Sequence, residues 1–289
     1  MEFTRNLKKG MSGEDVRAAK ERLVTLGYLH AATKFTFGSD TYNAVKAFQQ
    51  ANGLQVDGII GAETFYKLFY NEVDKPTQEA VIVPERFSTA ARMAIGTELA
   101  QVSELRREIC LDALQWAVEA EEKPASMMAF YIRGGNMYNK DLTLNVMTPE
   151  KLKAYFAKPN YAPYYDGGRE ELITETAMRS MYQLPGYDCS GQIVGLMRKH
   201  GIYPPDFDAN ANTLGASHTV RTENPQAGDW ACRSGHIGLY VGGGYAVEAI
   251  GGAYGVQLTR TKKRMVFNFQ TRKIQNFGSW EYFGDPKRY

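Results

Sequence analysis

Hydrophobic periodicity is lost between residues 71 and 95, and this loss limits the fold more than any other feature of the sequence. Apolar residues recur at helical spacing before and after it, whereas residues 71–95 contain Pro76 and Pro84 in loop-forming surroundings. We therefore expect a linker at residues 71–95. A chain of 289 residues is long enough for a domain on each side of it. The sequence predicts a small domain at residues 1–70 and a larger one at residues 96–289.

The composition is that of a globular protein. Hydrophobic residues make up 44% of the chain and charged residues 23%, which excludes a mainly disordered protein. The net charge of +2 gives no reason to expect a nucleic acid or a membrane surface as partner. No apolar run reaches the roughly 18 residues of a spanning helix, and the first residues show no apolar signal core. Three interpretations stay open: action in the cytoplasm, release by another route such as host-cell lysis, or a trimmed sequence.

A short repeat marks two helix starts in the first domain. Residues 38–42 recur as residues 61–65, with Gly at the first position and Thr at the fourth, and apolar residues at helical spacing follow each copy. Ser12, with Asp15 three residues later, indicates a capping box at the start of an earlier helix, and Gly27 would end that helix. The first domain is therefore predicted to be a bundle of three helices.

This domain resembles the three-helix type of peptidoglycan-binding domain. The motifs that carry the resemblance are Gly10-x-x-Gly13-x-x-Val16, Ala47-Phe48-Gln49 and Leu54-x-Val56-Asp57-Gly58-x-x-Gly61-x-x-Thr64. The resemblance implies bacterial peptidoglycan as a partner. A spacer or a pro-segment with the same fold is the alternative, because a fold does not identify a ligand.

The three cysteines are too few for a disulfide framework, and their odd number leaves at least one thiol free. Cys189 begins a stretch of helical spacing that ends at Gly201. At a helix N-terminus, unpaired N–H groups and the helix dipole favour a thiolate. Cys110 lies within a helix expected at residues 98–122 and is interpreted as a small buried hydrophobe, and Cys232 as a strand residue. Cys189 is therefore the candidate nucleophile.

A candidate base lies in an expected β-hairpin, where two alternating runs flank the glycines at 242–244. A two-residue loop would place His236 and Glu248 on opposite faces. A three-residue loop pairs Gly238 with Glu248 and brings His236 and Glu248 onto one face. In that register Gly238 and Ala246 lie beside His236, and their small size would leave room for a helix to approach.

These motifs resemble those of the NlpC-type cell-wall cysteine peptidases, a branch of the papain-like superfamily. The residues that carry the resemblance are Asp188-Cys189-Ser190-Gly191, Gly228-Asp229 and Gly235-His236-Ile237-Gly238-Leu239-Tyr240. The resemblance implies an α+β domain in which a helix bearing the cysteine packs on an antiparallel sheet. It also implies cleavage of an amide bond in the stem peptide of peptidoglycan, commonly at γ-D-glutamyl-diaminopimelate.

The same resemblance implies the roles of the site residues. Cys189 would be the nucleophile, His236 the base and Glu248 the third polar residue, which is another histidine in many relatives. Residues 131–135 (Tyr-Ile-Arg-Gly-Gly) look like the family's Tyr-x-Trp-Gly-Gly motif, with Arg133 in place of the tryptophan. Tyr131 would be a second donor to the oxyanion. No cofactor or metal is implied, and we expect a monomer that acts at the cell wall.

More than fifty residues separate Tyr131 from Cys189, and compact relatives have a much shorter connection. We therefore interpret residues 136–186 as an insertion with helices at Pro149–Phe156 and Glu170–Met181. Long segments beside active sites often determine specificity, although this one could equally be inert.

Other interpretations remain open at this stage. Cys189, Cys232 and His236 could hold a metal ion, but the sequence offers no clear fourth ligand. The chain could be a wall-binding protein with an inactive hydrolase domain, or an amidase at the muramoyl–L-alanine bond or an acyltransferase that uses the same cysteine. Residues 256–289 carry eight basic residues, Arg264 among them, which we interpret as a solvated face.

Overall fold

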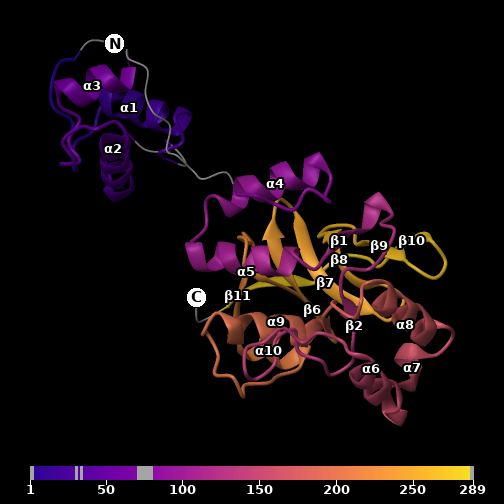
Figure 1. Cartoon of the computed structure of the whole chain (residues 1–289). Coiled ribbons are helices and arrows are strands. Elements are labelled where there is room, and N and C mark those ends of the chain that lie inside the picture. Colours follow the sequence, from indigo (N-terminus) through magenta and orange to yellow (C-terminus); the bar gives the residue numbers. More distant parts are fainter. Residues whose placement is uncertain (1–2, 30–31, 33–34, 70–80, 287–289) are drawn as a thin grey trace. The chain divides into compact units, whose positions relative to one another are not determined.

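The computed structural model describes residues 3–29, 32, 35–69 and 81–286. The chain divides into two compact units, residues 1–79 and residues 80–289. The first is helical and the second is rich in sheet, so the predicted α+β architecture is confirmed (Figure 1). Within the described residues, no helix is long and apolar enough to cross a membrane.

The first unit contains the three expected helices, α1 (Glu14–Thr25), α2 (Ser39–Ala51) and α3 (Ala62–Phe69). Both repeated segments begin helices as predicted, and Gly27 follows α1 with φ +82°, a conformation that favours glycine. The capping box at Ser12 is wrong. The N-cap is Gly13, because the Ser12 backbone forms a β-bridge with Thr36 and its hydroxyl donates to Thr36 Oγ1 at 3.0 Å.

The side chain of Gln49 holds together the segment that connects α2 and α3. It is 1% exposed, and its Nε2 donates to Asp57 Oδ1 at 2.8 Å and to the carbonyl of Ile59 at 2.9 Å. Its Oε1 accepts from the N–H of Gly58 at 2.8 Å. Gly58 has φ +73°, and a Cβ there would lie 2.2 Å from the ring of Tyr42. These residues of the wall-binding motif therefore stabilise the fold of their own segment.

The second unit is built on a sheet whose seven strands, all within the described residues, follow the order β1-β8-β7-β6-β5-β11-β4. Neighbouring strands are antiparallel except for β1 and β8. Two small ladders accompany it, β9 with β10 and the parallel pair β2 with β3. The strands are β1 (Val118–Glu119), β2 (Phe130–Tyr131), β3 (Gly186–Tyr187), β4 (Thr219–Thr222), β5 (Trp230–Arg233), β6 (His236–Gly242), β7 (Tyr245–Gly251), β8 (Gly255–Arg260), β9 (Met265–Asn268), β10 (Lys273–Asn276) and β11 (Tyr282–Pro286).

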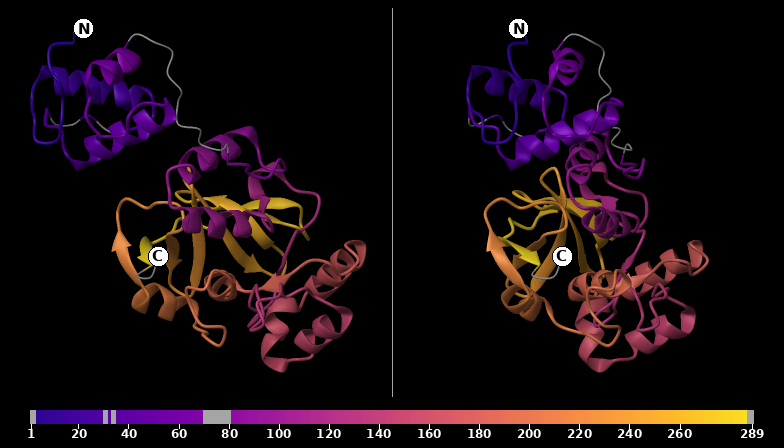
Figure 2. Two further views of the ribbon diagram at one scale, coloured as in Figure 1. Left: turned by 60° about the vertical axis from the view of Figure 1, so that its left-hand side comes forward. Right: turned by 90° about the vertical axis from the view of Figure 1, so that its left-hand side faces the viewer.

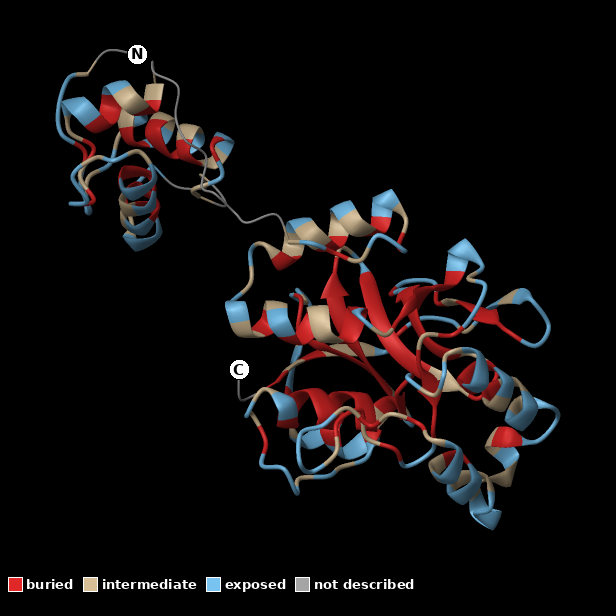
Figure 3. Ribbon diagram, viewed as in Figure 1, coloured by how far each residue is buried: buried red, intermediate tan, exposed pale blue. Residues whose placement is uncertain are grey.

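Three helices pack against the centre of this sheet, α4 (Thr89–Leu99), α5 (Glu104–Leu114) and α9 (Cys189–Lys199), and all of them contact β6 (Figures 1 and 2). The shorter α10 (Ala211–Ser217) lies against β5 and β6. Figure 3 shows that β6, β7 and α9 form the most deeply buried part of the unit. The predicted packing of the cysteine-bearing helix on an antiparallel sheet is confirmed.

The predicted linker is too long. Residues 70–80 lie outside the described residues, but α4 begins at Thr89, and its residues Ala91, Ile95 and Leu99 are buried in the core. These side chains repeat every four residues and are placed on one face of a helix capped by Ser88. Ala91 and Ile95, which the predicted linker included, therefore belong to the second unit, and the loop-forming residues before them concealed the helix.

The single helix predicted at residues 98–122 is also wrong, because within that range α4 ends, α5 forms, and β1 and a 3-10 turn at Ala120–Glu122 follow. Helix α4 ends at Leu99, and Ser103 caps α5 by accepting from the N–H of Arg106. Cys110 is fully buried within α5, as predicted.

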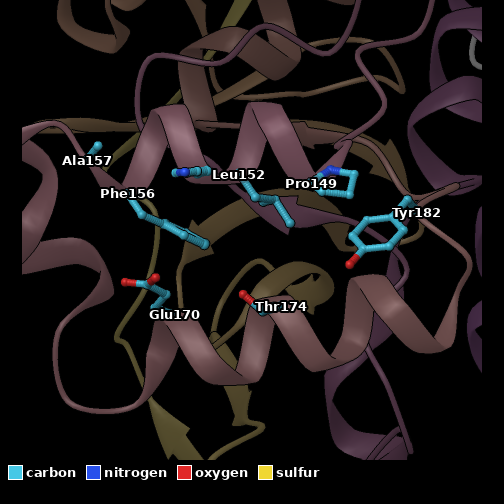
Figure 4. Close-up of a pocket in the computed structure, with 8 residues that line it drawn as sticks. Pro149, Leu152, Phe156, Ala157, Glu170, Thr174 and Tyr182 are labelled. Atoms are coloured by element: carbon cyan, nitrogen blue, oxygen red, sulfur yellow. The ribbon is translucent and has the colours of Figure 1, made fainter.

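Residues 136–186 carry helices in the expected places. They are α6 (Pro149–Phe156), α7 (Ala162–Tyr165) and α8 (Arg169–Arg179), with 3-10 turns η1 (Ala120–Glu122) earlier in the chain and η2 (Pro159–Tyr161) before α7. The bounds of α6 are those predicted, and α8 ends two residues early because Met181 and Tyr182 have positive φ. A pocket of about 420 Å³ lies between α6 and α8, with Leu152 and Phe156 on one side and Thr174 on the other (Figure 4).

Replacement of Gln49 by Leu should destabilise the first unit by about 2 kcal/mol, because the N–H of Gly58 and the Asp57 carboxylate lose buried partners. Hydrogen exchange of the segment 39–69 in the full chain measures this change. Gln50→Leu at the exposed neighbouring position is the matched control. Equal protection in the two variants would show that the Gln49 contacts carry no such stability.

Candidate active site

Cys189 is the first residue of α9, and the residue before it caps the helix. The Asp188 carboxylate accepts from the N–H of Gly191 at 2.8 Å and from the hydroxyl of Ser190 at 2.9 Å. The Cys189 side chain is therefore held at the positive end of the helix dipole, where the predicted thiolate would be stabilised. Cys189 is 6% exposed and forms no disulfide.

Asp188 also fixes the segment that contains Tyr131. Its second carboxylate oxygen accepts from the N–H of Gly134 at 2.8 Å, and its own N–H donates to the carbonyl of Gly135 at 3.0 Å. Strand β2 pairs with β3, which leads directly into α9. A Cβ on Gly191 would lie 1.9 Å from the Gly135 oxygen, so only glycine permits this approach. The structure therefore brings Tyr131 beside Cys189 although the sequence separates them.

Tyr131 is 5% exposed, and its hydroxyl remains protonated. Burial raises the pKa of this phenol, and the neighbouring Cys189 and Asp188 raise it further. A hydrogen bond with Arg133 acts in the opposite direction and is the weaker effect. Arg133 is exposed, and its guanidinium lies 5.1 Å from the centre of the Tyr164 ring on α7. Arg133 thus lies beside the site, at the motif position where the resemblance leads us to expect a tryptophan.

The predicted register of the hairpin is confirmed. Leu239 lies opposite Val247, so Gly238 faces Glu248 as the sequence suggested. The three-residue loop that we expected is wrong, because Gly242 pairs with Tyr245 and leaves a two-residue turn. A β-bulge between Tyr240 and Gly242 supplies the extra residue instead, which keeps the side chains of β6 and β7 on the required faces.

This register joins His236 to Glu248. The imidazole Nε2 lies 2.7 Å from Glu248 Oε2, and Cys189 is near enough to the imidazole to influence its pKa. Burial lowers the pKa of His236, but the interactions with Cys189 and Glu248 outweigh this effect and raise the pKa to about 9. His236 is therefore protonated at neutral pH and lies between the thiol and the carboxylate.

The space beside Gly238 and Ala246 is filled by Trp280, and the prediction that a helix would occupy it is wrong. A Cβ on Gly238 would lie 3.0 Å from the Trp280 ring. Trp280 packs with Ala246, whereas α9 packs on the neighbouring side chains of β6 that point to the other face. The Trp280 ring is nearly parallel to that of His236, at 8° and with the ring centres 5.2 Å apart. It thus covers the imidazole.

Glu248 is completely buried and holds a negative charge there. The Thr259 hydroxyl donates to its Oε1 at 2.5 Å, and Arg264 donates to Oε1 from Nε at 3.0 Å and to Oε2 from Nη2. Burial by itself would raise the pKa of Glu248, but the bonds with His236 and Arg264 lower it to about 2. The carboxylate is therefore ionised at neutral pH.

Arg264 is the residue that the sequence analysis missed. It is 2% exposed, so its assignment to a solvated face is wrong. Lys287 and Arg288 of the same basic stretch lie outside the described residues. One signal could have found Arg264: an acidic residue on an otherwise apolar strand, such as Glu248, requires a buried cation nearby.

The other cysteines are separate from this site. Burial raises the pKa of the Cys110 thiol and raises that of Cys232, in β5, to about 11. Cys232 lies on a strand, as predicted, and is 2% exposed. Among the described residues, no group of three or more His, Cys, Asp or Glu side chains is arranged to hold a metal ion.

Comparison with known proteins finds a family for each unit. Residues 12–68 match the family model of a peptidoglycan binding domain, PG_binding_1, and residues 160–274 match that of the NlpC/P60 family. The second match includes Cys189, His236, Glu248 and Arg264 but not Tyr131.

Curated and solved proteins resemble parts of the chain. The protein disulfide isomerase pTAC5, chloroplastic, of Arabidopsis thaliana is 33% identical over 111 residues, which cover 37% of this chain and 28% of that protein. A spore cortex-lytic enzyme of Bacillus cereus is 41% identical over 58 residues, or 20% of this chain and 22% of the enzyme.

A crystal structure of a peptidoglycan-binding protein from Clostridioides difficile is 49% identical over 22% of this chain and 40% of its own, with a TM-score of 0.22. Each similarity thus concerns one region, and this chain spans less than a third of the length of either curated relative. On the family matches, the chain joins a domain of the PG_binding_1 family to a domain of the NlpC/P60 family.

Proposed function

We propose that this protein is a peptidoglycan hydrolase that cleaves an amide bond of the stem peptide with Cys189 as nucleophile. The observation that carries the proposal is the arrangement of Cys189, at the start of a helix, beside His236, which is hydrogen-bonded to Glu248 on the adjacent strand. A thiol, an imidazole and a carboxylate in this order form the usual unit of cysteine acyl transfer. The substrate makes the cell wall the expected place of action.

In the proposed reaction, the Cys189 thiolate, paired with the protonated His236, attacks the amide carbonyl carbon and forms a tetrahedral oxyanion. His236, protonated at neutral pH, gives its proton to the amine that leaves as the C–N bond breaks. Water then attacks the thioester, and His236 accepts its proton; the free acid leaves and the thiolate–imidazolium pair is restored. Glu248 holds the imidazole through Nε2, so that Nδ1 faces Cys189.

Two donors are available to the oxyanion in this proposal. One is the backbone N–H at the start of α9, which is free of an intrahelical partner. The other is the Tyr131 hydroxyl, which the raised pKa keeps in its protonated, donating form. Both donors lie beside Cys189. The N–H belongs to α9, and Tyr131 belongs to the segment that Asp188 holds against α9.

The surroundings of Tyr131 support an anionic peptide as substrate. In a γ-linked D-glutamyl residue the α-carboxylate remains free, and Arg133 offers an exposed guanidinium next to Tyr131. Tyr164 of α7 stacks on Tyr131 with the ring centres 6.1 Å apart, so the segment 136–186 contributes a wall of this region. We therefore favour cleavage at the γ-D-glutamyl-diaminopimelate bond and assign the segment a part in shaping the groove.

Digestion of purified peptidoglycan followed by mass spectrometry of the fragments tests the proposal. We expect new amine termini at diaminopimelate, and their complete loss in Cys189→Ala, because no other group can form the thioester. Cys232→Ala, at a buried cysteine outside the site, is the matched control and should retain activity. Fragments cut at the muramoyl–L-alanine bond would indicate an amidase, and wall binding without any cleavage would indicate an inactive binding protein.

Limited alkylation tests the choice of nucleophile without a substrate. Substoichiometric iodoacetamide at neutral pH should label Cys189 before Cys110 and Cys232, whose burial and raised pKa values leave almost no thiolate. Peptide mapping by mass spectrometry identifies the labelled residue. Preferential labelling of Cys232 would contradict the assignment.

Replacement of Arg133 by Gln should raise KM about tenfold for a stem peptide with a free α-carboxylate on D-glutamate, because one charge-assisted contact is lost. A peptide in which this carboxylate is amidated should show no such difference between the two proteins. Arg179→Gln on the exposed side of α8 is the control. An equal loss for both peptides would exclude the carboxylate as the group that Arg133 recognises.

A further inference from the structure

Arg264 is a buried cation that the reaction described above does not use. Its guanidinium donates hydrogen bonds to two neighbours, Glu248 and Phe277. Nε and Nη2 donate to the two oxygens of Glu248, and Nη1 donates to the carbonyl of Phe277 at 3.1 Å. A two-pronged contact of this kind fixes both the position and the plane of a carboxylate, which a single hydrogen bond cannot do.

The plane of the Glu248 carboxylate decides where the imidazole can lie. Oε2 accepts from Arg264 and is 2.7 Å from His236 Nε2, whereas Oε1 accepts from Arg264 and from Thr259. Rotation of the carboxylate would therefore break contacts on both oxygens at once. The His236 ring takes its direction from an oxygen that the arginine holds in place.

The Trp280 side chain contacts both Arg264 and His236. The Arg264 Cζ lies 4.5 Å from the centre of the Trp280 ring, and the His236 ring stacks on Trp280 in a nearly parallel orientation. Trp280 is 7% exposed, so it keeps water from this group of charges and preserves their attraction. Arg264 thus contacts both side chains that hold the imidazole from behind.

We propose that Arg264 is a positioning residue of the active site, which fixes the Glu248 carboxylate and the Trp280 ring so that His236 is directed at Cys189. This inference rests on the proposed function, because His236 needs a direction only if it acts on Cys189. It also gives a reason for a glutamate at the third position of the triad: the buried carboxylate is paired with a cation supplied by the residue before β9.

The charged groups that face the His236–Glu248 pair determine the effect of a substitution. Cys189 faces His236 from α9, and Arg264 faces Glu248; Arg233, opposite His236 in the ladder, donates to the Phe277 carbonyl. In Arg264→Met the carboxylate keeps only the imidazolium as its counter-charge, so it holds that proton more tightly. The titration midpoint of His236 should move up by about one pH unit, and kcat should fall about a hundredfold because the ring loses its direction.

Arg264→Lys separates charge from geometry. The lysine keeps the positive charge but has no fork, so the midpoint of His236 should stay near that of the parent while kcat remains clearly below it. Arg260→Met on β8 is the matched control, because Arg260 is half exposed and pairs with Glu121 outside the site. It should leave both quantities unchanged.

The experiment follows the His236 ring proton by NMR as a function of pH and measures kcat on peptidoglycan fragments for the same proteins. The chain has four histidines, and loss of one signal in His236→Gln assigns the resonance. A folded Arg264→Met protein with the parental midpoint, or with the parental kcat, would overturn the proposal. If that variant does not fold, an Arg264→Lys protein with the parental kcat would overturn it, and one with a reduced kcat and a parental midpoint would support it.

The NMR titration needs no turnover. A parent protein that releases no fragments would therefore refute the proposed function, whereas an unmoved His236 midpoint in Arg264→Met would refute the positioning role of Arg264.

Discussion

A buried negative charge at Glu248 is the constraint on which the second unit depends. A carboxylate that is fully removed from water is unstable unless cations and hydrogen-bond donors replace the solvent. Here the partners come from three places in the chain: His236 on β6, Thr259 on β8 and Arg264 before β9. The ring of Trp280, before β11, packs on His236 and Arg264. The sheet must bring these segments together, so the polar group specifies the arrangement of the strands around the hairpin.

The second requirement is the close approach of α9 to the segment 131–138. Asp188 makes two hydrogen bonds across this contact, with Gly134 and Gly135, and the absence of side chains at Gly191 and Gly195 lets the backbones touch. The helix therefore begins at a place where its first residue faces both Tyr131 and His236. A small set of steric and capping requirements thus positions the nucleophile, in addition to the packing of apolar side chains.

Much of the fold could be predicted from local sequence. The three helices of the first unit, the cysteine at the start of α9, the α6 helix and the register of the hairpin follow from spacing, capping and alternation. Helix α4 and the break before α5 could not be predicted as easily, because loop-forming residues next to a helix conceal its start and a short interruption looks like a continuous apolar stripe. Motif residues of the first unit illustrate a related limit, since Gln49 and Asp57 are occupied in holding their own loop.

The sequence by itself determined which residues could carry the chemistry: a cysteine at a helix N-terminus and a histidine and a glutamate on adjacent strands, each identified by its local surroundings. Only the tertiary structure decided which other side chains hold the histidine and the glutamate in place. Arg264 and Trp280 belong to segments whose local pattern indicates nothing unusual, and a run of basic residues is normally solvated. Their role arises from long-range pairing, because the attraction between a buried carboxylate and a cation depends on their distance in space and not on their separation along the chain.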